Sequence, residues 1–510
     1  MSTSPEMLVE ARSGACPRVR LHDHGNVTRR RHHANANEFD HRDSTRRRRF
    51  RLANGLDSLV TIAQAQSQPK TFADRLNYSR AIEAVIWARP LTGFKAMMDG
   101  LQRDGDVGNH DIGYFSRVQN SKLKWPTTNA TTPYALGYWS VEKEPVVVQI
   151  PPESPDIKIF GTLLDAWQRP MADVGPEGVD GGRGAKYLLI APEYRGPVPI
   201  GFIPVQQTTH NGWVSLRLIL KDNSPASLQK VAAYVKQVTI SPLSQVNDPK
   251  TRHIDLFDKK VNLVSPLDAE MFRTLHAIIQ NERTEERDLV AMGMLQSLGI
   301  EKGKQFAPSA EMVAMLDAAA KETQAHMRRR YLFDVASYYP GTQWRFAFTP
   351  GVYETRYTGI YPGYVDLDAR GEMYNYSWGS AERVGKATYY INLAADAKGQ
   401  PLDGSRNYRL KVPANAPVTQ FWAASTQTDE NGAFMDVPGR VALSSTDEGV
   451  VKNPDGSVDV YFGPKAPQGR ESNWVQTATD KRWFIMFRFY GTQPAVYDKS
   501  WSMGDMETLN

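Results

Sequence analysis

The sequence contains a single cysteine, Cys16, among its 510 residues. One thiol excludes disulfide bonds within the chain, and it excludes zinc sites built from four cysteines or from two cysteines and two histidines. The sequence also has no run of 18 or more apolar residues, so it predicts no membrane-spanning segment. The folded protein must therefore be stabilised by packing.

The sequence lacks the motifs of several common enzyme classes. The pentapeptide GxSxG of serine hydrolases does not occur, and neither does the P-loop pattern or GxGxxG after a strand. The run GGRG at 181–184 lies in a polar stretch and is typical of a flexible loop. We therefore expect no nucleotide cofactor.

Histidines are few outside the N-terminal region, and they are scattered. They are His110, His210, His253, His276 and His326. None of them forms an HxH or HxxxH pair, so a compact histidine metal site is not expected. Acidic residues at 104, 106 and 111 could bind calcium, but their spacing lacks the glycine and terminal glutamate of an EF-hand. We interpret them as solvated loop acids, and we predict neither a metal site nor a cofactor.

The formal net charge of +5 is concentrated at the N-terminus. Residues 1–53 hold 12 Arg, no Lys and 6 acidic residues, so the remaining 457 residues carry a net charge of −1. Nucleic-acid-binding proteins normally have a basic face on their folded part, and a near-neutral body does not favour one. We expect no nucleic-acid partner.

The N-terminal region 1–65 is an arginine-rich leader with too little apolar material to form a core. Residues 45–50 read TRRRRF, and they are followed by the apolar-leaning stretch 52–62 and by Ala63-Gln64-Ala65. This order is typical of an export signal cleaved after Ala65, and it predicts a periplasmic or secreted protein. Because the apolar stretch is short and interrupted by polar residues, a cytoplasmic protein with a disordered leader is the alternative.

The length of the chain exceeds what one hydrophobic core usually holds, so two or three domains are expected. Residues 66–125 are predicted to form a helical lead-in. Its apolar positions, such as Ile82, Val85 and Trp87, recur at helical spacing until Pro90, which is expected to stop or kink the helix.

Residues 126–262 and 336–510 show short apolar or alternating runs between glycine and proline, as is typical of β-sandwiches. Between them, residues 263–335 have helical periodicity, beginning with a predicted helix start at Ser265-Pro266. The sequence therefore predicts a mainly β protein. Two antiparallel β-sandwich domains, Ig-like or jelly-roll-like, are joined by a helical connector.

The stretch 453–474 shows the β pattern most fully. NPDG at 453–456 predicts a turn, and residues 458–462 alternate as a strand. Gly463-Pro464 ends the strand, and a polar and aromatic cluster follows at 471–474. The stretch predicts a hairpin-like unit with a candidate site beside it.

Short segments distributed along the chain resemble one bacterial family. In the first half they include NATTPY at 129–134, DAW at 165–167, DVG at 173–175 and GPVP at 196–199. In the second half they include NPDGS at 453–457, YFGP at 461–464, Glu471, NW at 473–474 and Arg488. Over most of residues 75–505 the chain is similar to proteins that carry the domains DUF1254 and DUF1214 in tandem. The resemblance implies two β-sandwiches joined by helices, frequent export and homo-oligomers, and it implies no established reaction.

The strongest candidate chemistry combines carboxylates with aromatic side chains. In carbohydrate enzymes paired carboxylates act as acid and base, aromatic faces stack on sugars, and guanidinium groups hold acidic substituents. The predicted catalytic residues are Asp165, Asp173, Glu471 and Arg488. The predicted substrate-binding residues are Tyr134, Trp167, Tyr461, Asn473 and Trp474.

The same residue types also have structural roles. A tryptophan in a sandwich is usually core, an aspartate after a strand usually caps a turn, and a Glu–Arg pair on neighbouring strands often fixes a sheet edge. We predict a hydrolase that acts on a glycan or another small polar substrate, which requires the two acidic clusters to share a cleft. The alternatives are a non-catalytic envelope or surface-binding homo-oligomer, and a metal-assisted lyase or hydrolase.

Overall fold

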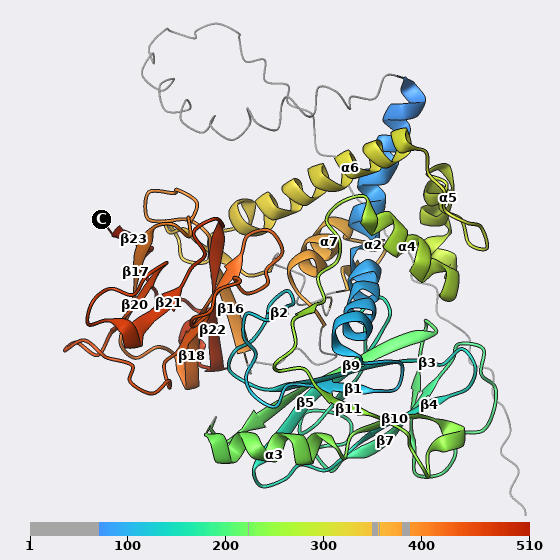
Figure 1. Ribbon diagram of the computed structural model, residues 1–510, viewed down its shortest axis with the longest axis horizontal. Helices are drawn as coiled ribbons and strands as arrows, with labels where there is room; N and C mark the ends of the chain where they lie inside the picture. Colours follow the sequence, from blue (N-terminus) through green and yellow to red (C-terminus); the bar gives the residue numbers. More distant parts are fainter. Residues whose placement is uncertain (1–70, 223, 349–354, 356–357, 380–387, 510) are drawn as a thin grey trace, which may run out of the picture. The chain divides into compact units, whose positions relative to one another are not determined.

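The computed structural model describes residues 71–510, except for 223, 349–354, 356–357, 380–387 and 510 (Figure 1). The predicted leader at 1–65, its export signal and its cleavage point lie outside the described residues. Two β-sandwiches and a group of helices make up the described part, which confirms the predicted mainly β fold. None of the helices described is long and apolar enough to cross a membrane.

The first β-sandwich consists of two sheets. One has six strands in the order β11-β1-β3-β9-β5-β6, and the other has four in the order β10-β4-β7-β8. The six-stranded sheet comprises β1 (Ile112–Tyr114), β3 (Tyr134–Ser140), β5 (Ile157–Asp165), β6 (Pro170–Val174), β9 (Asn211–Leu220) and β11 (His253–Asp255). The four-stranded sheet comprises β4 (Val146–Ile150), β7 (Ala185–Ile190), β8 (Ile203–Gln206) and β10 (Thr239–Pro242).

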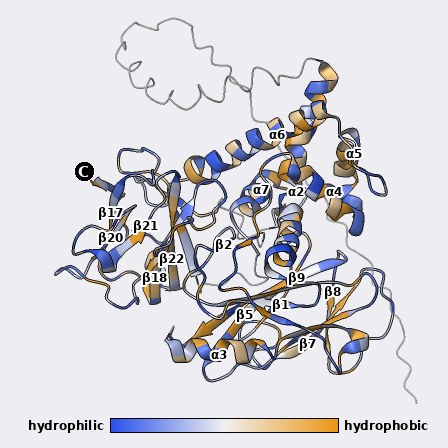
Figure 2. Cartoon of the chain, in the orientation of Figure 1, coloured by the Kyte–Doolittle hydropathy of each residue, from blue (hydrophilic) through white to orange (hydrophobic). Residues whose placement is uncertain are grey.

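Side chains that alternate between the two faces of these strands build the core between the two sheets. Leu163 and Val214 contribute from one sheet, and Val148, Tyr187 and Leu189 contribute from the other; all five side chains are buried. Figure 2 shows the strands of this sandwich coloured largely hydrophobic, whereas α6 (Ala310–Arg329) carries both colours. The period of two therefore places one face of each strand in the core.

Most strand pairs of the first sandwich are antiparallel, as predicted, but two pairs differ. β1 pairs in parallel with β11, and β7 pairs in parallel with β8.

The helix α3 (Pro225–Val235), which was not predicted, follows β9. Ser224 caps this helix by accepting a hydrogen bond from the Ser227 amide, and a proline occupies the first position of the helix.

The second β-sandwich also has two sheets, in the orders β13-β16-β22-β18-β19 and β21-β20-β17-β23. The first comprises β13 (Trp344–Phe346), β16 (Thr388–Leu393), β18 (Val418–Thr428), β19 (Ala442–Ser444) and β22 (Trp483–Thr492). The second comprises β17 (Asn407–Val412), β20 (Val458–Gly463), β21 (Trp474–Gln476) and β23 (Glu507–Leu509). Aromatic side chains such as Trp422, Phe487 and Trp483 fill the core between them.

Short strands and helical turns lie between the elements of the two sandwiches and the helices. They are β2 (Leu123–Lys124) with β12 (Val261–Asn262), β14 (Ile360–Tyr361) with β15 (Tyr364–Val365), η1 (Leu243–Gln245), η2 (Glu286–Asp288), η3 (Arg330–Asp334), η4 (Glu471–Asn473) and α8 (Pro494–Tyr497).

The long helix α2 (Phe72–Gly105) begins with a capping box in which Thr71 and Asp74 bond each other's main-chain amides. The expected stop or kink at Pro90 is wrong as a stop, because the helix continues to Gly105. Helices α4 (Glu270–Asn281), α5 (Leu289–Ser297) and α6 supply apolar side chains to the cluster built on α2. In Figure 1 these helices surround α2.

One helix prediction needs correction, and a further helix was not predicted. Ser265-Pro266 was expected to start a helix, but α4 begins at Glu270 and has no side-chain cap; the buried Ser265 hydroxyl bonds Thr92 of α2 instead. The helix α7 (Leu367–Tyr376) lies in the range assigned to the second sandwich. Because α7 is buried on all sides from Ala369 to Tyr376, it lacks the polar face that marks a surface helix in a sequence.

Candidate functional site

Asp165, at the end of β5, is fully engaged by its neighbours. Its carboxylate accepts hydrogen bonds from the Arg169 amide at 2.9 Å, from Arg169 Nε at 2.5 Å and from the Thr208 hydroxyl at 2.9 Å. Its side chain is 2% exposed, and Arg169 continues to Glu285 at 2.8 Å. This ion-pair network closes the turn after β5, so the geometry gives Asp165 a structural position.

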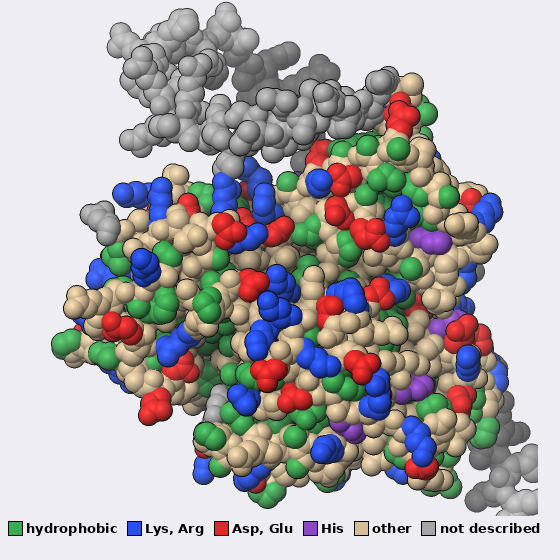
Figure 3. Space-filling model, viewed as in Figure 1, with side chains coloured by type: hydrophobic (Ala, Val, Ile, Leu, Met, Phe, Trp, Pro, Cys, Tyr) green, Lys and Arg blue, Asp and Glu red, His purple; other side chains and the backbone are tan. Residues whose placement is uncertain are grey.

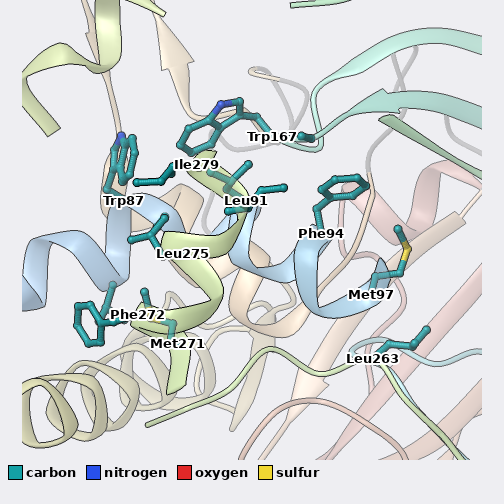
Figure 4. Packing of buried hydrophobic residues seen from close by; sticks show 14 of the residues in the cluster. Trp87, Leu91, Phe94, Met97, Trp167, Leu263, Met271, Phe272, Leu275 and Ile279 are labelled. Atoms are coloured by element: carbon teal, nitrogen blue, oxygen red, sulfur yellow. The ribbon is translucent and has the colours of Figure 1, made fainter. Parts of the chain in front are cut away.

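Asp173 and Trp167, which the sequence placed beside Asp165, are also buried. Asp173 accepts a 2.8 Å hydrogen bond from the Thr162 hydroxyl, its partner on the adjacent strand β5. Trp167 packs edge-on against Trp87 with ring centroids 5.0 Å apart, and Figure 4 shows both in the apolar cluster of the helices. With 6% of its surface exposed, Trp167 offers no open face to a sugar.

The predicted residues of the second half hold the edge of the sheet β21-β20-β17-β23. Asn473 donates to the carbonyl oxygens of Val451 at 2.8 Å and Asp459 at 2.9 Å, and the half-buried Trp474 donates from Nε1 to Gly463 at 3.0 Å. These bonds fix the loop that joins β20 to β21.

Glu471 and Tyr461 lie beside this loop. Tyr461 is buried, with the Arg470 guanidinium 6.0 Å from its ring centroid. Glu471 is exposed, and the Gly469 amide donates to it at 3.0 Å. This bond and one from its own amide hold the pKa of Glu471 below its usual range. Among the described residues, Glu471 and Asp165 share no hydrogen-bond or ion-pair partner, so the structure does not bring the two acidic clusters together.

Two of the nine predicted residues, Tyr134 and Arg488, do converge, and they do so through residues that the sequence pattern does not single out. Tyr134 on β3 lies opposite Arg217 on β9, and Arg217 Nε donates to the Tyr134 hydroxyl at 2.8 Å. Arg488 on β22 lies opposite Tyr390 on β16, with its guanidinium carbon 5.4 Å from the centre of the Tyr390 ring. Each sandwich thus contributes one tyrosine–arginine pair.

The two pairs meet where the sandwiches contact each other within the compact unit 63–510. Arg488 Nη2 donates to the carbonyl oxygens of Thr127 at 2.9 Å and Thr128 at 2.7 Å, and the Thr131 hydroxyl donates to that of Tyr490 at 3.1 Å. We refer to Tyr134, Arg217, Tyr390, Arg488 and Tyr490 as the tyrosine–arginine cluster.

The loop that Arg488 holds has an uncommon backbone. Thr127 has φ +58°, in the left-handed region that β-branched residues rarely adopt. Its amide is also fixed, by the carbonyl oxygen of Gly432 at 3.0 Å. Such conformations persist where the surrounding structure determines them, and they concentrate at functional sites.

The cluster carries positive charge that no described carboxylate neutralises. Neither Arg217 nor Arg488 forms an ion pair with a described Asp or Glu. Burial alone would raise the pKa of Tyr390, but the positive charges of Arg217 and Arg488 outweigh it and lower that pKa. For Tyr490 burial dominates and raises the pKa. Tyr390 therefore ionises more readily than its neighbour Tyr490.

Exposure gives the cluster an inner and an outer side. Arg488 and Tyr490 are buried, whereas Tyr134, Arg217 and Tyr390 are half-buried. The next residue on the same face of β16, Asn392, is 0% exposed, and its side-chain amide has no hydrogen-bond partner in the described part of the chain. Polar atoms in this position are usually satisfied by water or by a bound molecule.

Arg217 and Tyr390 lie outside the loop positions at which the sequence indicates chemistry. Both lie inside strands, and Arg217 stands in the largely apolar run WVSLRLIL. A lone arginine in such a run was the available signal, because charged residues are seldom buried without a purpose. No group of three or more His, Cys, Asp or Glu in the described ranges could hold a metal ion.

Two family descriptions match the chain, and both read "Protein of unknown function". DUF1254 matches residues 111–242, and DUF1214 matches residues 386–494. Tyr134 and Arg217 fall in the first match, while Tyr390, Arg488 and Tyr490 fall in the second. No curated protein matches the chain in sequence.

The fold is similar to that of a solved structure. The crystal structure of the VPA0106 protein from Vibrio parahaemolyticus is 18% identical, with a TM-score of 0.52 over 85% of this chain and 100% of that one. An uncharacterized protein from Burkholderia cenocepacia is 13% identical, with a TM-score of 0.38 over 89% of this chain and 98% of that one. The two matched domains occur in the expected order, and the chain belongs to the family of proteins that carry DUF1254 and DUF1214 in tandem.

Proposed function

We propose that the protein is an enzyme that removes a proton next to the carboxylate of an anionic substrate at the tyrosine–arginine cluster. One observation carries this proposal. Tyr390 has a lowered pKa and lies between Arg217 and Arg488, for which the described chain supplies no carboxylate partner. A phenolate is a strong base, a lowered pKa makes it easier to form, and clustered groups with shifted pKa values are typical of active sites.

The charge balance of the cluster selects an anionic substrate. Two guanidinium groups and one phenolate leave a single positive charge, which a substrate carboxylate would neutralise. Arg217 is half-buried and can face this carboxylate, with the planar fork geometry that suits it. Arg488 is 2% exposed and already bonds Thr127 and Thr128. In this proposal it does not contact the substrate, and its positive charge stabilises the ionised form of Tyr390.

The proposed reaction is a proton abstraction followed by an elimination. The Tyr390 phenolate takes the proton from the carbon next to the carboxylate, and the electron pair of that C–H bond moves onto the carboxylate, where Arg217 stabilises the added charge. When this electron pair returns, a double bond forms between the deprotonated carbon and the next carbon. The bond from that next carbon to its oxygen breaks, and the oxygen receives a proton from Tyr134 or Tyr490. Acidic sugars have this arrangement of groups, which connects the proposal to a glycan substrate.

Hydrolysis of the same acidic glycan is the alternative reaction. Tyr390 would then take a proton from water instead of from carbon. The predicted carboxylate pair gains no support from the geometry, because Asp165 is held by Arg169 and shares no partner with Glu471. The products distinguish the two reactions, because elimination yields an unsaturated carboxylate that absorbs ultraviolet light and hydrolysis does not.

The test is a screen of the purified protein against uronate-containing glycans and small carboxylates, with ultraviolet absorbance and reducing ends as readouts. Tyr390→Phe and Arg217→Lys are expected to lower turnover at least about a hundredfold, as loss of a general base or of a charge-stabilising group does. Tyr364→Phe, at a side chain that is 60% exposed, is the matched control. Unchanged turnover in Tyr390→Phe contradicts the proposal.

The cellular location and the oligomeric state of the protein are also part of the proposal. We propose that the leader directs export to the periplasm or the medium and that the mature protein is a homo-oligomer, as the family resemblance implies. Mass spectrometry of the N-terminus should find Gln66 as the first residue after cleavage. Light scattering of the mature protein should give a multiple of the chain mass; a full-length monomer contradicts both.

A further inference from the structure

The first sandwich carries a cavity of about 740 Å³ that lies away from the tyrosine–arginine cluster. Its lining comes from one end of the four-stranded sheet, where β4 ends and where β7, β8 and β10 begin. No residue of the cluster lines it. We refer to this cavity as the basic groove. Its volume falls within the range of about 300 to 1,000 Å³ that is typical of small-molecule sites.

Strand register places a row of polar side chains across the floor of the basic groove. Gln149 on β4 lies opposite Lys186 on β7 and opposite Thr239 on β10. Because side chains alternate along a strand, this row faces the same side of the sheet as Val147 and Leu188, which is the side away from the sandwich core. The groove is therefore built on the outer face of the sheet.

The lining of the basic groove contains three cations and no acid. The cations are Arg183, Lys186 and Lys236, and none of them forms an ion pair with a described carboxylate. This is unusual on a molecule whose charges are otherwise mixed, as the face shown in Figure 3 illustrates with interspersed basic and acidic side chains. Three unpaired cations around one cavity favour an anion.

Apolar groups line the same groove. Ile150, Pro151 and Phe202 contribute to the wall, and the Lys186 ammonium lies 5.8 Å from the centre of the Phe202 ring. Ile200 stands at the rim and is fully exposed, at 103%. Neighbouring Val198 is 43% exposed in the same loop. The groove thus offers apolar surface directly beside its positive charge.

We propose that the basic groove binds an anionic amphiphile, a molecule with a carboxylate or phosphate head and an apolar tail. The head lies between Lys186 and Arg183, with Lys236 completing the positive end. The tail lies along Phe202 and Pro151 and reaches Ile200. Burial of the tail and pairing of the head both contribute, so neither a small anion nor an uncharged chain binds as well. The proposal does not depend on the reaction at the tyrosine–arginine cluster.

Isothermal titration calorimetry with decanoate, below its micelle concentration, tests the proposal directly. Lys186→Ala should weaken decanoate binding about tenfold, which corresponds to about 1.4 kcal/mol. Ile200→Ser changes a fully exposed side chain, so it should leave folding intact and weaken decanoate several-fold. Lys230→Ala is the matched control, because Lys230 pairs with Asp156 on the same sandwich and does not line the groove.

Three further probes separate the contributions of head, tail and surface. Acetate and inorganic phosphate test the anion without a tail, decanol tests the tail without a charge, and vesicles of phosphatidylglycerol test an anionic membrane. Decanoate should bind more tightly than acetate, phosphate and decanol. The proposal is overturned if decanoate does not bind, if Lys186→Ala binds it unchanged, if acetate or phosphate binds equally well, or if the vesicles alone bind.

Discussion

Arg488 of the second sandwich donates a 2.9 Å hydrogen bond to the carbonyl oxygen of Thr127, which stands 361 positions earlier in the chain. Thr127 belongs to the loop before β3 of the first sandwich. The same guanidinium lies over Tyr390, so one side chain joins the two matched domains and sets the charge at the proposed base. The contact between the two domains and the proposed chemistry therefore depend on the same side chain.

Replacing Arg488 with Met should destabilise the protein. The substitution leaves the carbonyl oxygens of Thr127 and Thr128 without their donor in a buried environment, which costs about 2 to 4 kcal/mol. Urea unfolding of both proteins measures the difference. Arg409→Met is the matched control and should change the unfolding free energy by less than about 1 kcal/mol, because its ion pair with Glu507 is exposed. Equal effects of the two substitutions contradict the interdomain role of Arg488.

The lowered pKa of Tyr390 predicts a pH profile. In the proposed mechanism turnover requires the Tyr390 phenolate, so turnover should rise with pH as Tyr390 ionises, at a pH below the usual value of 10 for tyrosine. Arg217→Met removes one of the two positive charges, raises the pKa of Tyr390 and moves this rising limb to higher pH. Arg217→Lys keeps the charge and should move it less.

Ultraviolet difference spectra provide a check on this profile that is independent of activity. The wild type should show one tyrosine that ionises before the others, and Tyr390→Phe should remove that step. Tyr490→Phe should retain it, because the pKa of Tyr490 is raised by burial. A profile that does not shift in Arg217→Met, or an early step that survives in Tyr390→Phe, contradicts the assignment.

Much of the fold could be predicted because apolar and polar residues alternate along strands that are buried on one face only. The run 458–462 was predicted as a strand, and β20 spans Val458–Gly463. The helix α7 could not be found in the same way, because its burial on all sides removes the polar face that periodicity detects. Pro90 does not end α2, because a long buried helix can lose one main-chain hydrogen bond and still be stabilised by its packing.

The site was less predictable than the fold. Tyr134 and Arg217 are 83 positions apart in the chain, and their contact depends on which strands are neighbours in the sheet. Residue type alone also does not show where a side chain lies, because Asp165 and Asp173 are held by bonds at a turn and between strands, and Trp167 packs in the core. The sequence grouped Arg488 with Glu471 and Trp474, whereas its partners Tyr390 and Thr127 follow only from strand register and packing.

Asp165 and Glu471 should respond differently to loss of charge. Asp165→Asn breaks a buried ion pair with Arg169, so it should cost about 3 kcal/mol of unfolding free energy while the folded fraction keeps its turnover. Glu471→Gln alters an exposed side chain and should change the unfolding free energy by less than about 0.5 kcal/mol. Denaturant unfolding and turnover, normalised to folded protein, measure both. A stable Asp165→Asn protein without turnover would restore Asp165 as a catalytic candidate.

Glu282 should make the stability of the protein depend on pH. Its side chain follows α4 and accepts hydrogen bonds from the His210 amide at 2.8 Å and the Asn211 amide at 3.1 Å. Burial outweighs these bonds and raises the pKa of Glu282 from 4.5 to about 7. Between these two values the folded protein holds a proton that the unfolded chain has released, so the unfolding free energy falls as pH rises through this window.

Substituting Glu282 with Gln tests this linkage. Across the window from pH 4.5 to about 7 the wild type should lose on the order of 3 kcal/mol relative to Glu282→Gln, and the difference should stay constant at higher pH. Urea unfolding at closely spaced pH values measures it. His210→Gln is the control, because the His210 amide bonds Glu282 and the His210 ring lies 3.5 Å from Glu193. If the pH dependence disappears in His210→Gln and persists in Glu282→Gln, the histidine is its source and the raised pKa of Glu282 is wrong.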